Sequence, residues 1–466
     1  MQVRVLGQHI PVPIAVLTVI EGTIFFAALI VAALMRFREG IGAIEEDVGP
    51  LWPRALLFSG VMVMCLLAFG LYSGRQRART FGIVVRVAAA AAACLAATAV
   101  FFYLIPNLYI GRGVLAFAVV GAIGGVAISR LVIAHVVGDD TFKRRVLVYG
   151  SGRSASAIAN LRRRSDRRGF TVVGFVQPPN EVRIIPDDRM LKAEHGLREL
   201  CERYDVAEVV VAMEDRRRGF PARDLLDCRL AGIEVIELLT LLERETGRVR
   251  IDALNPSWMI FGDGFRRDSF RLLSSRLLDL SASLVIVLLT APLMLITALA
   301  IKLEEGWSAP VFYRQERVGL GGKTFELLKF RSMRTDAEKP GEAVWAQKND
   351  TRVTRVGGII RKLRIDELPQ ILNVLRNDMS FVGPRPERPA FVAELAEKIP
   401  YYVQRHCVKP GITGWAQLCY PYGSCEQDAL EKLQYDLYYI KNNCFLFDVS
   451  ILVQTAEVVF MGKGAR

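Results

Sequence analysis

The sequence predicts a membrane protein of mixed α and α/β class, and three observations support this. Hydrophobic residues make up 52% of the 466 residues, although 23% are charged; this mixture is typical of membrane segments joined to soluble domains. Four long apolar runs open the chain, which predicts a four-helix transmembrane bundle. Strand-like and helix-like segments then alternate, which predicts a Rossmann-like α/β middle domain. The predicted parts are a transmembrane domain at 1–140, the α/β domain at 143–245, a linker at 246–270, and a mainly helical cytoplasmic domain at 271–466.

The four apolar runs each approach the length of about 20 residues that a bilayer-spanning helix needs. Cytoplasmic loops carry an excess of Lys and Arg. Here the loop "SGRQRART" after the second run and "TFKRR" after the fourth are basic, so both ends of the bundle and everything after residue 143 are expected in the cytoplasm. The interiors of the runs hold few ionisable residues, with Glu21 as the one possible exception among acids, which favours an anchor or dimerisation platform over a transporter. The runs lie at 12–35, 51–72, 81–105 and 113–137.

Charge and cysteine content narrow the classes of partner. The net charge of +12 favours anionic partners. In a membrane protein without a nucleic-acid-binding signature, these are phosphates and lipid headgroups rather than nucleic acid. The eight cysteines form no CxxC pair, so the sequence predicts neither a zinc site nor a disulfide framework.

The middle domain begins with "VLVYGSGRSASAIA", which reads as a strand, a glycine turn and a helix. Gly150, Gly152 and Ala155 approximate the GxGxxA pattern of dinucleotide-binding loops. That pattern also requires an acidic residue at the end of the second strand, where this chain has Gln177. A structural or regulatory module is therefore favoured over an NAD site. Gly150 and Gly152 stay candidates for a nucleotide loop, and a membrane-bound nucleotide sensor is the alternative function.

A fifth apolar run at 277–303 is long enough to span the membrane, yet basic residues flank it on both sides. A spanning helix would place one of these basic clusters outside the cell, against the positive-inside tendency. Pro292, after Ala291, lies near the middle of the run and removes a helix hydrogen bond, which promotes a kink. A re-entrant helix that bends at Ala291–Pro292 is favoured slightly over an ordinary fifth span.

The last third contains "RKLRIDELPQILNVL", in which Asp366 and Glu367 are adjacent in a basic setting. It follows a predicted β-hairpin rich in cations, and the apolar spacing predicts a short helix that begins near Pro369. Nearby cations keep a carboxylate ionised, which suits a Mg²⁺ ligand or a carboxylate nucleophile. Acids, Mg²⁺ and a cationic cradle together fit phosphoryl transfer. The alternative interpretation is salt-bridged capping of the helix.

Three segments in this region, "KFRSM", "DELPQILNVLRNDMSFVGPRP" and "VKPGITGWAQ", resemble the bacterial polyprenyl-phosphate sugar-1-phosphate transferases of the monotopic phosphoglycosyl transferase superfamily. The N-terminal helices and middle domain are similar to its long form, which initiates exopolysaccharide or O-antigen assembly. The resemblance implies an enzyme of the bacterial inner membrane with its catalytic domain on the cytoplasmic face. It implies transfer of a sugar-1-phosphate from a UDP-sugar to undecaprenyl phosphate with release of UMP, contact with membrane lipid, and a homodimer.

The same resemblance implies roles for individual residues. Asp366 corresponds to the family's nucleophile, and Mg²⁺ is implied at Asp366 and Glu367, although direct attack by the prenyl phosphate stays open. The re-entrant helix corresponds to 277–303, with Ala291–Pro292 where the family commonly has Ser-Pro. The sugar itself is not predicted. The expected phosphate-binding residues are Lys329, Arg331, Arg361 and Arg385 from the family motifs, and Arg364 from its proximity to the acids.

Overall fold

The structure, a computed structural model, describes residues 2–5, 8–38, 40–72, 80–136, 143–161, 169–179, 181–217, 219–254, 269–334, 352–420 and 425–460. The chain divides into two compact units, Met1–Ala253 and Leu254–Arg466. Most of the predicted linker lies outside the described residues, as do the arginines of "SGRQRART". The four finer domain boundaries predicted from the sequence therefore stay predictions.

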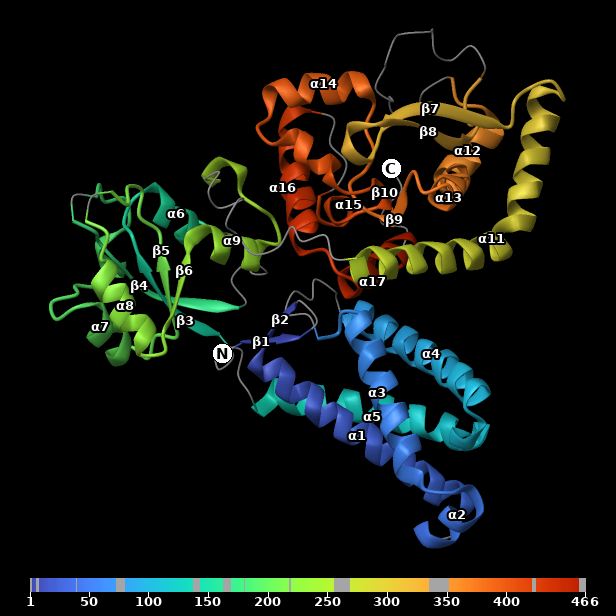
Figure 1. Ribbon diagram of the computed structural model, residues 1–466, viewed down its shortest axis with the longest axis horizontal. Helices are drawn as coiled ribbons and strands as arrows, with labels where there is room; N and C mark the ends of the chain where they lie inside the picture. Colours follow the sequence, from blue (N-terminus) through green and yellow to red (C-terminus); the bar gives the residue numbers. More distant parts are fainter. Residues whose placement is uncertain are drawn as a thin grey trace. The chain divides into compact units, whose positions relative to one another are not determined.

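The helices of the N-terminal part fall on the four apolar runs, as predicted (Figure 1). Together with α11 of the second unit they make five described helices that are long and apolar enough to cross a membrane. A short hairpin before the first run and a short helix after it were not predicted. The elements are β1 (Gln2–Val5), β2 (Gln8–Pro11), α1 (Val12–Phe37), α2 (Ile41–Val48), α3 (Leu51–Ala68), α4 (Thr80–Leu104) and α5 (Arg112–Val136).

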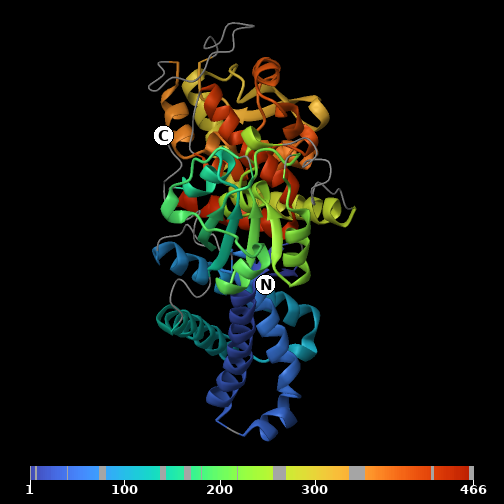
Figure 2. The same cartoon turned by 90° about the vertical axis from the view of Figure 1, so that its left-hand side faces the viewer.

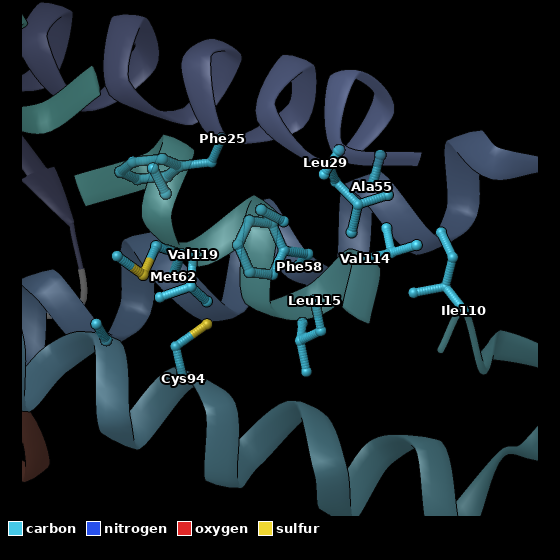
Figure 3. Packing of buried hydrophobic residues seen from close by; sticks show 14 of the residues in the cluster. Phe25, Leu29, Ala55, Phe58, Met62, Cys94, Ile110, Val114, Leu115 and Val119 are labelled. Atoms are coloured by element: carbon cyan, nitrogen blue, oxygen red, sulfur yellow. The ribbon is translucent and has the colours of Figure 1, made fainter. Parts of the chain in front are cut away.

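Large apolar side chains join these helices. Phe25 of α1, Phe58 and Met62 of α3, and Cys94 of α4 are all fully buried, and Val119 of α5 lies in the same cluster. Figure 3 shows these side chains directed into the space between the helices. Helix α1 packs against both α3 and α5, and α4 packs against α3. Dispersion contacts of this kind are a main source of helix association in a bilayer, where the hydrophobic effect between helices is absent.

Glu21, the one acid noted inside the first run, is fully buried and paired. Its carboxylate accepts hydrogen bonds from the Tyr72 hydroxyl at 2.5 Å and the Ser129 hydroxyl at 3.2 Å. The Arg130 Nε donates to the same carboxylate at 3.2 Å. A buried charge is tolerated when it is paired and hydrogen-bonded, and this group ties α1 to α5.

The middle part of the first unit contains a four-stranded parallel sheet with strand order β4–β3–β5–β6. Parallel neighbours joined by helical connections define an α/β domain, so the predicted alternation is confirmed at this level. The finer assignment to a dinucleotide-binding type stays a prediction. The elements are β3 (Arg144–Tyr149), α6 (Arg153–Ala159), β4 (Phe170–Val176), α7 (Leu197–Arg203), β5 (Glu208–Val211), α8 (Ala222–Leu230), β6 (Glu234–Glu237) and α9 (Leu238–Thr246).

Helices cover both faces of this sheet, as the clusters on either side of β3 indicate. Val146 and Val148 pack with side chains of α6 and α9. Leu147 and Tyr149 pack with side chains of α7 and α8. Successive strand side chains point to opposite faces, and a strand buried on both faces reads as a continuous apolar run. Figure 2 shows the strands, in green, running side by side.

The second unit is mainly helical, with one antiparallel hairpin and one short parallel pair, β9–β10. The hairpin β7–β8 and the helix that begins after Pro369 agree with the sequence prediction. The elements are α11 (Ser269–Glu305), β7 (Phe312–Val318), β8 (Thr324–Phe330), α12 (Arg355–Lys362), α13 (Gln370–Leu375), β9 (Ser380–Val382), α14 (Pro389–Lys398), β10 (Gly411–Thr413), α15 (Trp415–Cys419), α16 (Glu426–Asn442) and α17 (Phe445–Phe460).

Helix α11 is bonded to the rest of this unit near its start and at its end. Near the start, the Arg276 guanidinium donates to two carbonyls in the last turn of α13. The Asp279 carboxylate accepts from the Ser380 hydroxyl and the Phe381 N–H, both at 2.9 Å. At the end, the Glu304 carboxylate accepts from the first two N–H groups of α12. Between these contacts the helix contains Pro292 and bends sharply (Figure 1).

Candidate active site

Asp366 and Glu367 lie in a 3₁₀ turn, Ile365–Glu367, between α12 and α13. The turn begins at Arg364, whose backbone is left-handed with φ = 55°. A non-glycine residue costs roughly 1–2 kcal/mol in that conformation, so the surrounding packing must hold the turn. Pro369 follows at the start of α13, where its fixed φ favours the helix.

The apolar residues that bracket the acids provide this packing. Ile365 and Leu368 pack against a buried cluster made by Ile301 of α11, Phe330 of β8 and Ile360 of α12. In the pattern "IDEL" the two apolar side chains are three residues apart and share one face of the turn. The two acids between them are only partly buried. The spacing thus anchors the turn and leaves the carboxylates accessible.

Glu367 lies among three cations that come from three different segments. The Lys329 Nζ on β8 and an Arg385 guanidinium nitrogen each lie 3.4 Å from its Oε1. An Arg364 guanidinium nitrogen lies 3.7 Å from its Oε2. Only 18% of the Glu367 side chain is exposed. Burial alone would raise its pKa, but Arg385, Lys329 and Arg364 together lower it to about 2, so Glu367 is ionised throughout the physiological range.

Asp366 is not surrounded by paired cations in the way that Glu367 is. Within the described residues, no hydrogen bond or ion pair joins its carboxylate to another side chain. Burial raises the pKa of Asp366, and the nearby charge of Glu367 raises it further, while the cations Lys329 and Arg361 act in the opposite direction. In the structure Glu367 holds the cations together, and Asp366 is the carboxylate that is available to a ligand.

The strand that carries Lys329 is fixed to α13 by a residue that was not predicted from the sequence. Asn373 of α13 is fully buried. Its Oδ1 accepts from the Leu328 N–H at 3.0 Å, and its Nδ2 donates to the Glu326 carbonyl at 2.7 Å. The amide therefore joins α13 to β8 beside Lys329. The available signal was a polar residue within an otherwise apolar helix segment, because a buried amide needs hydrogen-bond partners.

Arg317 of β7 holds the chain on the far side of Arg385. Its guanidinium donates to the Pro386 carbonyl at 2.9 Å and lies 3.4 Å from the Glu387 carboxylate. Burial lowers the pKa of Arg317 to about 10, and the neighbouring charge of Arg385 contributes to this shift. A cation this costly to bury adds positive potential to the site without contacting the acid pair.

Asp366, Glu367 and the cations beside them form an acid cluster, and not every predicted residue reaches it. Lys329, Arg364 and Arg385 contact Glu367, and the charge of Arg361 acts on Asp366. Arg331 instead donates its Nε to the Pro310 carbonyl at 3.0 Å. Residues two apart on an extended strand share a face, but Arg331 lies just beyond the end of β8, and among the described residues its guanidinium bonds the Pro310 carbonyl and neither acid. Its expected phosphate contact stays a prediction.

The donor set allows Mg²⁺ at Asp366. Among the described residues, no group of three or more His, Cys, Asp or Glu side chains is placed to hold a metal. Mg²⁺ does not require such a cage, because it keeps several waters and binds one or two carboxylates together with substrate phosphates. The unclamped carboxylate of Asp366 meets that need. Glu367 would have to share oxygens that already face three cations.

Comparison with known proteins places this site in a family. The family model described as bacterial sugar transferase matches residues 270–462, which include every residue of the acid cluster. Over 185 residues the chain is 44% identical to the UDP-glucose:undecaprenyl-phosphate glucose-1-phosphate transferase of Caulobacter vibrioides, covering 39% of this chain and 68% of that protein. The chain belongs to the bacterial sugar transferase family. The resemblance drawn from the three motifs is thus confirmed.

Two further relatives show how far the likeness of this sugar transferase extends. It is 29% identical over 480 residues to the UDP-glucose:undecaprenyl-phosphate glucose-1-phosphate transferase of Xanthomonas campestris pv. campestris, covering 99% of this chain and 96% of that protein. It is 44% identical over 264 residues to the UDP-N-acetylgalactosamine-undecaprenyl-phosphate N-acetylgalactosaminephosphotransferase of Aeromonas hydrophila, covering 57% of this chain and 61% of that protein. The chain therefore aligns with less than two thirds of the Aeromonas relative, whereas the Xanthomonas alignment includes the membrane helices and the middle domain.

The glycine loop of the middle domain is occupied by the sugar transferase's own carboxylates. The Ser151 N–H donates to Glu181 at 2.9 Å, and the Arg153 N–H donates to Glu214 at 2.5 Å. A Cβ on Gly152 would lie 2.6 Å from a Glu214 carboxylate oxygen, so this side chain would have to move to admit any other residue there. In dinucleotide-binding loops such N–H groups bind phosphate oxygens. This geometry agrees with the preference for a structural module, and nucleotide binding at Gly150 and Gly152 stays a prediction.

Proposed function

We propose that this chain transfers a sugar-1-phosphate from a UDP-sugar to undecaprenyl phosphate, releasing UMP and forming the lipid diphosphate sugar that begins an exopolysaccharide or O-antigen repeat. The observation that carries the proposal is an unclamped carboxylate, Asp366, beside Lys329, Arg364, Arg385 and an ionised Glu367. Cations fixed before the substrate arrives stabilise the charge of a phosphoryl-transfer transition state. The names of the relatives specify the same reaction class for those proteins.

In the proposed reaction, an Asp366 carboxylate oxygen attacks the phosphorus that carries the sugar. The bond between that phosphorus and the bridging oxygen breaks, and UMP leaves with the electron pair. An oxygen of undecaprenyl phosphate then attacks the same phosphorus and displaces the Asp366 carboxylate. Lys329 and Arg385 hold the phosphoryl oxygens in both steps, with Arg361 close to Asp366. Asp366 and Glu367 together would hold Mg²⁺, which would supply neutralisation of the phosphate charge.

A panel of UDP-sugars tests the proposal. Full-length protein in detergent or membranes is incubated with undecaprenyl phosphate, Mg²⁺ and one of UDP-glucose, UDP-galactose, UDP-N-acetylglucosamine and UDP-N-acetylgalactosamine. We expect UMP release for at least one sugar, dependent on the lipid and abolished by EDTA. The exposed hairpin variant Glu316→Gln serves as a matched acid control and should keep full activity. If no sugar in the panel yields UMP together with a lipid-linked product, the proposed function is wrong.

We further propose that α11 enters and leaves the membrane on one side, the cytoplasmic side of the bacterial inner membrane. A straight helix of its 37 residues would be about 55 Å long, more than a bilayer requires. Instead, Arg276 and Asp279 near its start and Glu304 at its end all bond to the same compact unit. The intervening Leu289 and Leu295 are 75% and 73% exposed, as lipid contact requires. The bend is assigned to Ala291–Pro292.

Cysteine accessibility separates re-entry from spanning. Single cysteines are placed at Ser269 and Ser308, on either side of α11, in a chain whose eight native cysteines are replaced. A membrane-impermeant maleimide should label both positions in inverted vesicles and neither in intact spheroplasts. Glu46→Cys, in the segment between the first two apolar runs that is expected outside, is the opposite control. Labelling of one α11 flank from each side would show that the helix spans the membrane.

A further inference from the structure

Arg385 is presented by a segment, 380–387, whose first four residues are held by hydrogen bonds to buried side chains and to a neighbouring backbone carbonyl. At its start, the Asp279 carboxylate accepts from Ser380 and Phe381. The Tyr439 hydroxyl then donates to the Val382 carbonyl at 3.2 Å. The Gly383 N–H donates to the Thr413 carbonyl at 2.9 Å. Such dense bonding of an irregular segment fixes the backbone from which the Arg385 side chain extends.

Arg405 provides the contact to Arg385 itself. It is 7% exposed, and one guanidinium nitrogen donates both to the Arg385 carbonyl at 3.0 Å and to the Asp436 carboxylate at 2.9 Å. A second nitrogen donates to the Tyr402 hydroxyl at 2.7 Å. The guanidinium carbon lies 5.1 Å from the centre of the Tyr402 ring. These contacts come from a backbone carbonyl, an acid on α16 and an aromatic residue.

A lysine cannot reproduce this arrangement. The guanidinium is planar and carries five donors in a fixed fork, whereas an ammonium is a point charge on a flexible stem. Burying an ion pair such as Arg405–Asp436 often contributes little net stability, because removing both charges from water costs as much as their attraction returns. Stability alone therefore does not explain why Arg405 and Asp436 are buried together. The hydrogen bond from Arg405 to the backbone carbonyl of Arg385 offers another reason.

We propose that Arg405, oriented by Asp436, is a positioning residue that places Arg385 against Glu367. The inference rests on the proposed function for its kinetic consequence, but the geometric claim is independent of it. Arg405 makes no contact with the acid pair in the described residues. It fixes the backbone of Arg385, and the Arg385 guanidinium lies 3.4 Å from the Glu367 carboxylate. Displacing that backbone by about 1 Å is enough to cost roughly 100-fold in rate at a preorganised site.

Kinetics of Arg405→Lys in two backgrounds tests the proposal. In the wild-type background we expect kcat to fall about 100-fold. In an Arg385→Ala background the same substitution should change kcat by no more than about twofold, because residues that act through one another are not additive. Arg244→Lys is the matched control: Arg244 is a partly buried arginine bonded to a fully buried acid, Glu208, but it lies in the other unit. It should leave kcat unchanged.

Equal losses in both backgrounds, or losses that simply follow the melting temperature, would assign Arg405 a structural role and overturn the proposal. A structure of the Arg405→Lys variant gives a second test that needs no turnover. The Arg385–Glu367 contact should be lost there, and its retention at 3.4 Å would equally overturn the proposal. If the wild-type chain releases no UMP with any sugar, the proposed function fails alone, and the variant structure still decides the positioning claim.

Discussion

Asp366→Asn is expected to abolish UMP release, with a loss of at least about 10³-fold in kcat, the scale for removing a group that bonds covalently to the substrate. Asparagine has the same shape as aspartate but is neutral and a poor nucleophile. Asp366 has no ion pair among the described side chains, so its substitution breaks no buried pair. We therefore expect the melting temperature to stay close to that of the wild type. Single-turnover measurement of UMP with the preferred UDP-sugar gives the rate.

The variant Glu367→Gln distinguishes the role of Glu367 from that of Asp366. Glutamine keeps the shape of the side chain but removes the charge that faces Lys329, Arg364 and Arg385. The three cations would then repel one another without compensation, so this variant should lose stability as well as rate. The covalent route also predicts a phosphorylated Asp366 that can be trapped in the wild type. An Asp366→Asn enzyme with more than a tenth of wild-type activity would contradict a nucleophilic Asp366 and favour direct attack by the lipid phosphate.

The elements that the sequence predicted well are those whose pattern is local. The long apolar runs predict helices, the segment "VLVY" predicts a strand, and the apolar spacing after Pro369 predicts a short helix. The structure has these elements at those places. The acid pair was also found from local evidence, because two carboxylates beside several cations are unusual in any fold. Lys329 and Arg385 reach Glu367 from 38 and 18 residues away, and only the family motifs indicated this grouping.

The parts that were missed depend on long-range contacts. Asn373 is one polar residue in a helix, and its role exists only because β8 packs beside α13. Arg405 lies in the unremarkable segment "YYVQRHC", and nothing local indicates that its guanidinium meets a carbonyl 20 residues away. Arg331 shows the opposite case. Its position in "KFR" suggested a phosphate contact, but the hydrogen bond to Pro310 depends on how the end of β8 meets the segment before β7.

Lys329→Met should lower kcat by about 10²–10³-fold, the typical effect of removing one preorganised donor from a charged transition state. Methionine fills a similar volume but carries no charge. Lys329 lies close to both acids: its Nζ is 3.4 Å from Glu367, and its charge opposes the burial that raises the pKa of Asp366. Arg385 and Arg364 remain beside Glu367 in the variant, so that carboxylate stays ionised. The loss should therefore report missing positive charge at the phosphates.

Two companion variants make this interpretation testable. Lys323→Met removes an exposed lysine from the turn of the same hairpin and should keep nearly full activity. Lys329→Arg retains the charge and should recover part of the rate, although the bulkier fork must fit a site fixed by Asn373. Burial lowers the pKa of Lys329, so methionine there should be tolerated with little loss of melting temperature. Equal activity of Lys329→Met and Lys323→Met would mean that the lysine is structural and that the arginines alone bind the diphosphate.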